Sequence, residues 1–231
     1  MSRTGNQQPP RWVVQHYQTL DSTMDRAGHF ARSGAAEGIV VVSEEQTAGR
    51  GRAGRTWHSP PGAALYATLL LRPPVPPERL TTLPLLAGVA VAEAIEELTG
   101  APAQLKWPND VWLGNDSGRQ KVAGILLTSA ISGAGVSHVL CGIGVNLTTP
   151  PEALPPGGTS ILAATGVATT PEAMLRALLP AFARQYARFL QYGGQPPLDT
   201  WRARAALLGE PVTIDEAGAT RAGRFAGIDP D

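Results

Sequence analysis

Residues 105–147 read LKWPNDVWLGNDSGRQKVAGILLTSAISGAGVSHVLCGIGVNL, and this stretch indicates how the chain folds. The runs Leu105–Leu113, Lys121–Ser129 and Val136–Leu147 are mainly apolar, short and bounded by turn residues, which is typical of strands. The first two flank the polar turn Gly114–Gln120. Strands joined by short connections pair in antiparallel fashion, because a parallel pair needs a longer crossover. This stretch therefore predicts a largely antiparallel sheet.

The rest of the chain adds strands and helices around this stretch. Further strands are expected at Trp12–Tyr17, Ile39–Ser43, Ala64–Leu71, Val212–Ile214 and Arg224–Ile228. Helices are expected from Ser22, which forms an S-x-x-D capping box with Asp25, to about Arg32, and at Thr82–Leu98, Pro171–Tyr192 and Leu198–Leu207. Helices that do not alternate strictly with strands predict an α+β fold, with a mixed, mostly antiparallel sheet and flanking helices.

Composition excludes several classes of protein. The 231 residues are 43% hydrophobic and carry 19 basic and 19 acidic side chains, so bulk electrostatic binding to DNA, RNA or an anionic membrane is not expected. The single cysteine, Cys141, excludes an intrachain disulfide and suits a reducing, cytoplasmic location. Met1–Pro10 lacks the apolar core of a signal peptide, and Leu83–Ile95 is shorter than the roughly 20 residues that span a bilayer.

The segment Gly49–Thr56 reads GRGRAGRT and resembles two phosphate-binding motifs superficially. It fits both G-x-G-x-x-G and a P-loop with arginine in place of lysine, but both motifs require a helix directly afterwards. Trp57–Gly62 contains two prolines and a glycine and does not start one. We therefore interpret the segment as a flexible loop whose arginines gather anions and which orders on ligand binding. A solvated or RNA-contacting basic loop is the alternative.

Five motifs in a fixed order carry a resemblance to a known family. They are Asp21–Asp25 (DSTMD), Glu45–Trp57 (EQTAGRGRAGRTW), Lys106–Asp110 (KWPND), Lys121–Leu126 (KVAGIL) and Gly142–Asn146 (GIGVN). In this order they resemble the catalytic domain of biotin protein ligases, over roughly Val13–Leu207. The resemblance implies a fold like that of class II aminoacyl-tRNA synthetases and an enzyme that joins biotin to a protein with ATP and Mg²⁺. Lipoate and octanoate ligases share the fold, but their Arg-Arg and Gly-Gly-Gly signature is not found, so they remain the alternative.

The resemblance assigns one group of residues to biotin. Ser22, Thr23 and Met24 match the segment that holds the ureido end of biotin, and Gln46 matches a further biotin contact. Hydroxyl and amide groups suit a neutral urea, which has both donors and acceptors. Ser22 also has the simpler interpretation of a helix cap.

A second group is assigned to the reacting groups. Arg50, Gly51 and Arg52 match the loop that closes over biotin and the adenylate. Lys121 matches the lysine that contacts both the carboxylate of biotin and the α-phosphate, and with Arg52 it is expected to be catalytic. A fixed cation lowers the barrier between two anions that repel each other. Of the 19 basic residues only Lys106 and Lys121 are lysines.

A third group is assigned to ATP and its metal ion. The expected ATP-binding residues are Arg50, Arg52, Arg55, Trp57, Lys106, Asn109 and Asn146. Asp110 is the expected Mg²⁺ ligand, since Mg²⁺ favours one or two carboxylates together with phosphate oxygens.

The resemblance also predicts domains and partners. Residues 1–11 are expected to be disordered, 12–208 to form the catalytic domain, and 209–231 to be the truncated start of an SH3-like β domain. About a dozen residues precede the first strand, so we expect no helix-turn-helix domain and no operator binding. The expected acceptor is a lysine on the biotin carboxyl carrier protein or domain of a carboxylase. The oligomeric state, a homodimer included, stays open.

Overall fold

A seven-stranded sheet forms the centre of the protein, whose computed structural model describes residues 10–58, 60–114, 118–133, 135–216 and 219–229. The strands are β1 (Val13–Leu20), β2 (Ile39–Gln46), β3 (Ala64–Leu71), β4 (Gln104–Lys106), β5 (Asp110–Leu113), β6 (Gln120–Ser132) and β7 (Gly135–Asn146). Their order across the sheet is β1-β2-β3-β7-β6-β5-β4. The pair β1–β2 is parallel and the remaining pairs are antiparallel, which confirms the predicted mixed, mostly antiparallel sheet.

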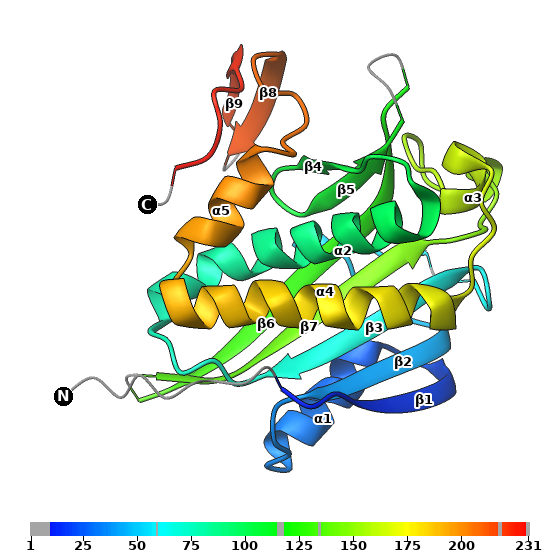
Figure 1. The fold of residues 1–231 in the computed structure, drawn as a ribbon. Coiled ribbons are helices and arrows are strands. Elements are labelled where there is room, and N and C mark those ends of the chain that lie inside the picture. The colour runs from blue at the N-terminus through cyan, green and yellow to red at the C-terminus, as the bar shows by residue number, and fades with distance from the viewer. Residues whose placement is uncertain (1–9, 59, 115–117, 134, 217–218, 230–231) are drawn as a thin grey trace.

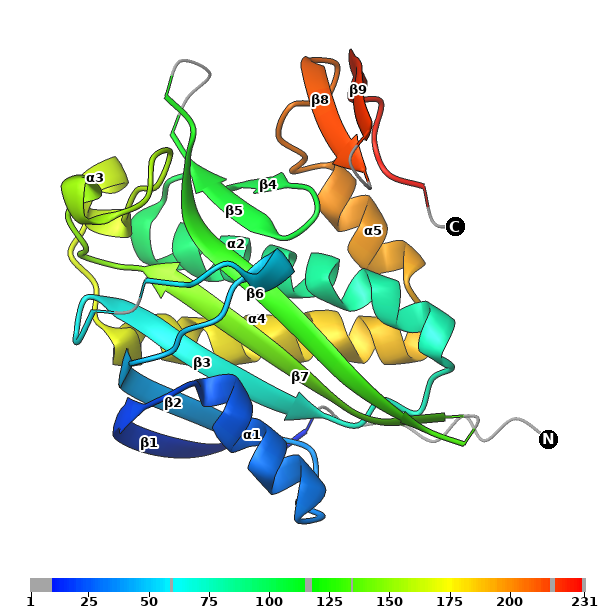
Figure 2. The same cartoon turned by 180° about the vertical axis from the view of Figure 1, so that it is seen from behind.

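Two layers of different thickness cover the sheet. Helices α2 (Leu83–Thr99) and α4 (Pro171–Tyr192) lie side by side on one face (Figure 1). Helix α1 (Thr23–Arg32) and the short 3-10 turn η1 (Arg52–Gly54) lie on the other face, over β3, β7 and β6 (Figure 2). The helical face therefore carries the two longest helices, while the opposite face carries only α1 and η1 among the described helices.

The main core lies between the sheet and its two long helices. Helix α2 is apolar nearly all round, which suits an element that packs against the sheet, α4 and the helix that follows α4. Helix α4 is amphipathic and contributes the buried rings of Phe182, Tyr186 and Phe189, which contact one another at centroid distances of 6.1 and 6.3 Å. Alternate residues of β3, such as Leu65 and Leu69, point into the same core.

The end of the chain packs beside β4. Helix α5 (Gln195–Arg202) leads to the hairpin of β8 (Pro211–Glu216) and β9 (Ala219–Arg224). The backbone of Leu105 donates to the Arg204 carbonyl at 2.9 Å and accepts from the Ala206 N–H at 2.8 Å. These bonds attach the segment after α5 to the edge of the sheet.

Three predicted elements differ from the structure. The strand predicted at Leu105–Leu113 is wrong as a single element, because Trp107–Asn109 form a turn that lets β5 fold back on β4. The strand predicted at Arg224–Ile228 is also wrong, since β9 ends at Arg224. Phe225 instead packs edge-on against Trp201 at 6.4 Å, and the Ile228 carbonyl accepts from Arg202.

The helix predicted at Leu198–Leu207 begins and ends earlier, as α5, because Pro196 and Pro197 fit the first helical turn. Short elements at Pro77–Thr82, Pro151–Ala153 and Ile161–Thr165 (η2, η3 and α3) were not predicted. The disorder predicted for residues 1–11 falls mostly on 1–9, which lie outside the described residues. Within the described part of the chain, no helix has the length and apolarity to cross a membrane.

Half of the predicted capping box is present at α1. Ser22 has extended backbone angles and its hydroxyl accepts the Met24 N–H at 3.3 Å, as an N-cap does. The carboxylate of Asp25 instead forms an ion pair with Arg50. The start of α1 is thereby linked to the arginine-rich loop.

Candidate active site

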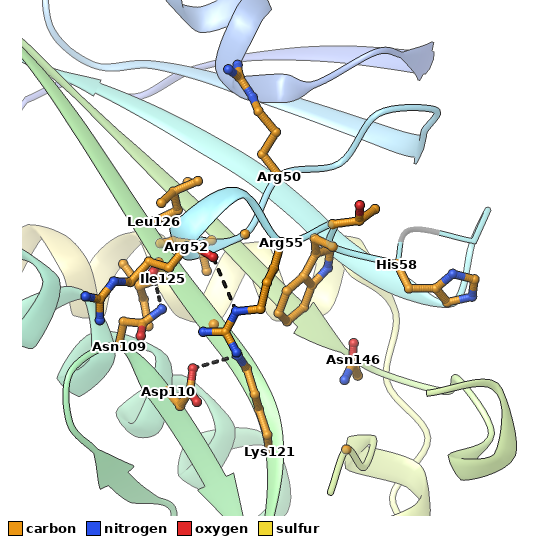
Figure 3. Close-up of a pocket in the computed structure, with 18 of the residues that line it drawn as sticks. Arg50, Arg52, Arg55, His58, Asn109, Asp110, Lys121, Ile125, Leu126 and Asn146 are labelled. Atoms are coloured by element: carbon orange, nitrogen blue, oxygen red, sulfur yellow. Dashed lines mark hydrogen bonds and ion pairs between the residues drawn. The ribbon is translucent and has the colours of Figure 1, made fainter. Parts of the chain in front are cut away.

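A cavity of about 400 Å³ opens on the face of the sheet that carries α1. All fourteen residues that the sequence assigned to biotin, ATP or metal line it, and they come from five separate segments of the chain. They are Ser22, Thr23, Met24, Gln46, Arg50, Gly51, Arg52, Arg55, Trp57, Lys106, Asn109, Asp110, Lys121 and Asn146. Figure 3 shows the loop residues and those of β5, β6 and β7 meeting around one space.

One end of the cavity is polar but uncharged. The side-chain carbonyl of Gln46 accepts both the backbone N–H of Thr23 at 2.8 Å and its hydroxyl at 3.1 Å. The Thr23 hydroxyl in turn accepts from Thr68 on β3 at 2.8 Å. Ser22 and Thr23 are 2% and 3% exposed, so their groups are held in place by the protein. Thr68 was missed by the sequence analysis, because only the pairing of α1 with β3 reveals it.

Three glycines form the floor of the cavity. Gly124 on β6 is paired with Gly144 on β7, and Gly142 lies two residues earlier on the same strand. A Cβ atom at Gly144 would lie 2.6 Å from the Trp57 ring, and one at Gly142 would lie 2.7 Å from the Met24 sulfur. Such distances are shorter than any real contact, so only glycine admits the indole and the thioether here.

The centre of the cavity is cationic. The ammonium of Lys121 lies 2.6 Å from a carboxylate oxygen of Asp110 and 5.2 Å from the centroid of the Trp57 ring. The backbone N–H of Lys121 donates to the Gly157 carbonyl at 2.8 Å, and its carbonyl accepts from the Thr159 N–H at 2.8 Å. Among the described lining residues Asp110 is the only acidic one, against five lysines and arginines. The cavity therefore suits an anionic ligand.

The arginine-rich loop forms a tight hairpin over this centre. The Gly51 N–H donates to the Arg55 carbonyl at 2.7 Å, and the Trp57 N–H donates to the Gly49 carbonyl at 2.9 Å. Figure 3 shows Arg52 directed toward Asn109 and Arg55 directed toward Asp110 and Lys121. Arg50 points toward α1 instead, in agreement with its ion pair to Asp25. The three arginines thus have different surroundings, which their spacing alone did not predict.

Two side-chain amides hold the walls together. Asn109 Nδ2 donates to the Ile125 carbonyl at 2.9 Å, and the buried Asn146 donates from Nδ2 to the Thr159 carbonyl at 2.9 Å. The structure therefore gives both residues a role in positioning the backbone in addition to the nucleotide contact predicted for them. Lys106 lies with its ammonium 5.4 Å from the centroid of the Trp112 ring.

Some lining residues were not singled out from the sequence. Tyr66, His58 and the segment Leu154–Gly158 also border the cavity. The last of these is rich in proline and glycine, and its contact with Lys121 joins positions far apart in the chain. Cys141 offers no nucleophile, since burial raises the pKa of its thiol to about 12. Within the described residues, no group of three or more His, Cys, Asp or Glu side chains could hold a metal ion.

Comparisons with known proteins identify the family of the chain. The profile of the Biotin/lipoate A/B protein ligase family matches residues 16–146. The biotin–[acetyl-CoA-carboxylase] ligase of Paracoccus denitrificans is 44% identical over 216 residues, which cover 90% of this chain and 88% of the relative. The bifunctional ligase/repressor BirA of Bacillus subtilis is 33% identical, covering 94% of this chain and 66% of that protein. The structure of the Aquifex aeolicus biotin protein ligase with biotin and ATP superimposes with a TM-score of 0.78 at 29% identity, over 94% of this chain and 88% of that one. The chain belongs to the biotin/lipoate A/B protein ligase family.

Proposed function

We propose that the protein is a biotin protein ligase, which activates biotin with ATP and transfers it to a lysine of another protein. The observation that carries this proposal is a single cavity with two distinct parts. One end, at Ser22 and Thr23, is polar but uncharged, and the centre, at Lys121, is cationic. The names of the relatives support biotin as the acid in preference to lipoate.

The uncharged end suits the ureido group of biotin. A urea has N–H donors and a carbonyl acceptor, and the hydroxyls of Ser22 and Thr23 together with the Gln46 amide supply groups of both kinds. Met24, seated on Gly142, gives the same end an apolar surface for the rest of the bicyclic ring. A ligand held there by its ring would direct its carboxylate toward the cationic centre.

The first step is attack of the biotin carboxylate on the α-phosphorus of ATP. The bond from carboxylate oxygen to phosphorus forms, the bond to the β-phosphate bridge breaks, and pyrophosphate leaves. We assign Lys121 to the point where both anions would meet. Arg55 is directed toward its ammonium, and Arg52 is directed toward Asn109, which borders the same cavity. These cations lower the repulsion between the reacting anions, so the enzyme acts by positioning and electrostatic stabilisation and needs no nucleophile of its own.

The nucleotide would occupy the part of the cavity that Trp57, Asn109, Asn146 and Lys106 border. Magnesium, when bound, would neutralise phosphate charge. Asp110 is the described lining residue that could hold it, together with phosphate oxygens, which fits the preference of Mg²⁺ for few carboxylates. The carboxylate of Asp110 also forms an ion pair with Lys121, which keeps that ammonium directed into the cavity.

The second step is attack by the amine of an acceptor lysine on the activated carbonyl. An amide forms, the bond between the acyl carbon and the phosphate oxygen breaks, and AMP leaves. The hairpin of residues 49–57 covers the cavity and would keep water from the mixed anhydride. We infer that the acceptor is the biotin carboxyl carrier protein or domain of a carboxylase, and that the reaction takes place in the cytoplasm.

The proposal is tested by exchange of labelled pyrophosphate into ATP with biotin, lipoate and octanoate offered separately. Biotin should support exchange at micromolar concentrations, whereas the other two acids should give no exchange above the blank. Exchange with lipoate or octanoate and none with biotin would contradict the proposal in favour of the alternative ligase. Binding of labelled RNA that weakens steeply with salt, without exchange for any acid, would favour the RNA-binding alternative.

A further inference from the structure

Arg72, which lies directly after β3, joins three segments that are distant in the sequence. Its guanidinium donates from Nη2 to the Ala31 carbonyl at 2.9 Å, from Nε to the Ala35 carbonyl at 3.0 Å, and from Nη1 to the Ser137 carbonyl at 2.7 Å. Each of its three nitrogens therefore has a backbone partner. This residue lies outside the cavity and belongs to none of the five sequence motifs.

Two of these carbonyls lie at the C-terminal end of α1. Ala31 is in its last turn, and Ala35 follows shortly after the helix ends. The last carbonyls of a helix have no partner within the helix, and a cation there also interacts favourably with the helix dipole. Ser137 lies near the start of β7, the strand that carries two of the floor glycines, Gly142 and Gly144. Arg72 thus fixes the far end of α1 to the strand that forms the cavity floor.

The backbone of Arg72 is itself held by Glu37. The backbone N–H of Arg72 donates to the carboxylate of Glu37 at 3.0 Å, and the same oxygen accepts the hydroxyl of Tyr186 at 3.2 Å. Tyr186 is fully buried in α4, and its burial, followed by the charge of Glu37, raises the pKa of the hydroxyl, which remains a donor. Arg72 is therefore connected through Glu37 to Tyr186, a residue of the main core.

In the described residues, the other polar side-chain contacts of helix α1 involve Thr23, Asp25 and Arg26, which lie in its first half. Its buried residues apart from Met24 are small: Thr23, Ala27, Gly28 and Ala31. The buried residues of the apolar cluster here are, in the described part of the chain, three from α1 and three from the sheet, with partly buried side chains such as Phe30 packed against them, whereas the other face of the sheet carries the main core. Small side chains bury little area, so packing alone leaves the angle of this helix weakly determined.

The opposite end of α1 forms the uncharged end of the cavity. Ser22 caps the helix, and Thr23 and Met24 are its first residues, at the opposite end of a helix that is roughly 15 Å long. A rigid helix that tilts at one end moves its other end, and Met24 has no spare room above Gly142. We propose that Arg72 is a positioning residue, which acts through α1 to hold the ureido-binding end of the cavity in place. This inference rests on the proposed function, because it assigns that end to biotin.

The inference is tested by the kinetics of Arg72→Lys and Arg72→Ala. Lysine keeps the charge but cannot bond three carbonyls with a planar fork. In biotin-dependent pyrophosphate exchange, both variants should raise the KM for biotin roughly tenfold, since a small displacement of positioning groups has effects of this order or larger. The KM for ATP should stay within about twofold, because the ATP-binding residues lie on other elements. Loss of folded protein would lower the rate without raising either KM.

Two controls make the result specific. Arg184→Ala removes an exposed ion pair to Glu93 on the helical face, and it should leave both KM values unchanged. Guanidinium ion at millimolar concentration should return the KM of Arg72→Ala for biotin toward that of the wild type. A rise in both KM values alike, or in neither, would overturn the inference.

A measurement without substrates separates this inference from the proposed function. The pKa of the His138 imidazole is lowered by burial and then by the charges of Arg72 and Arg32, so its NMR titration reports whether a cation remains at position 72. The His138 titration first verifies each substitution. Hydrogen exchange of the backbone amides of residues 23–32 should then be faster in both variants than in the wild type. If the wild type gives no biotin-dependent pyrophosphate exchange, the proposed function fails. Unchanged hydrogen exchange of the α1 amides in the variants would contradict the positioning role independently.

Discussion

The two faces of the central sheet are packed by different kinds of side chain. The helical face is filled by branched aliphatic and aromatic residues from α2, α4 and the strands β2 to β7, among them Leu86, Phe182 and Phe189. The cavity face has glycines at Gly124 and Gly144 where side chains would otherwise fill the space, and its polar groups are bonded to one another.

This difference separates stability from activity. Burial of large apolar side chains supplies most of the free energy of folding, so the helical face should determine how stable the protein is. The cavity face leaves room for ligands and fixes a few polar groups around that room. Substitutions on the two faces should therefore have different consequences, and the following predictions are ordered from the largest expected effect to the smallest.

Phe182→Ala removes a fully buried ring from the helical face. It should lower the free energy of unfolding by about 3–5 kcal/mol, because the transfer free energy of the ring is lost and a cavity remains. Chemical denaturation measures this. In the fraction that stays folded, the KM values for biotin and ATP should be those of the wild type. Tyr192→Ala, on the same helix but 63% exposed, is the matched control and should change stability little.

Lys121→Ala removes the cation from the centre of the cavity. Pyrophosphate release should fall by about 10²–10³-fold, which is the usual consequence of losing one group that stabilises a developing charge. The melting temperature should show that the fold survives, since the Lys121 side chain is partly exposed and lies outside the apolar core. Lys121→Arg should recover part of the rate. A rate for Lys121→Ala close to that of the wild type would show that another residue provides the stabilisation.

Gly144→Ala places a methyl group 2.6 Å from the Trp57 ring. Overpacking costs about 1–3 kcal/mol, so the indole should move and adenylate formation should fall roughly tenfold. Gly135→Ala, on the same strand, meets nothing within 4 Å and is the control. Equal activity in the two variants would mean that the floor does not need glycine. Formation of biotinyl-AMP in a single turnover is the measurement.

Much of the fold could be predicted from local sequence. The strand and helix patterns around Ile39–Ser43, Ala64–Leu71 and Pro171–Tyr192 lie within or match elements of the structure, because hydrophobic periodicity reflects which side is buried. The prediction failed where packing overrides local preference. The run Leu105–Leu113 has apolar residues at both ends, and the return of the chain at Trp107–Asn109 divides it into two strands.

The candidate site was predictable to a similar degree. The motifs identified which residues meet in one cavity, but they said nothing of the partners that those residues have there. The ion pairs of Arg50 with Asp25 and of Lys121 with Asp110 each join two different motifs. Thr68 and Arg72 gave no signal at all, because a threonine in a strand and an arginine after one are common.

The central claim is that this cavity joins biotin to a protein lysine through an acyl-adenylate. The most direct test is the intact mass of a biotin carboxyl carrier domain after incubation with the protein, biotin, ATP and Mg²⁺. The account predicts that the acceptor gains one biotinyl group, that each of biotin and ATP is required, and that Lys121→Ala abolishes the gain within the same time. An unmodified acceptor alongside active wild-type pyrophosphate release, or an acceptor that carries lipoyl or octanoyl in place of biotinyl when all three acids are offered, would contradict it.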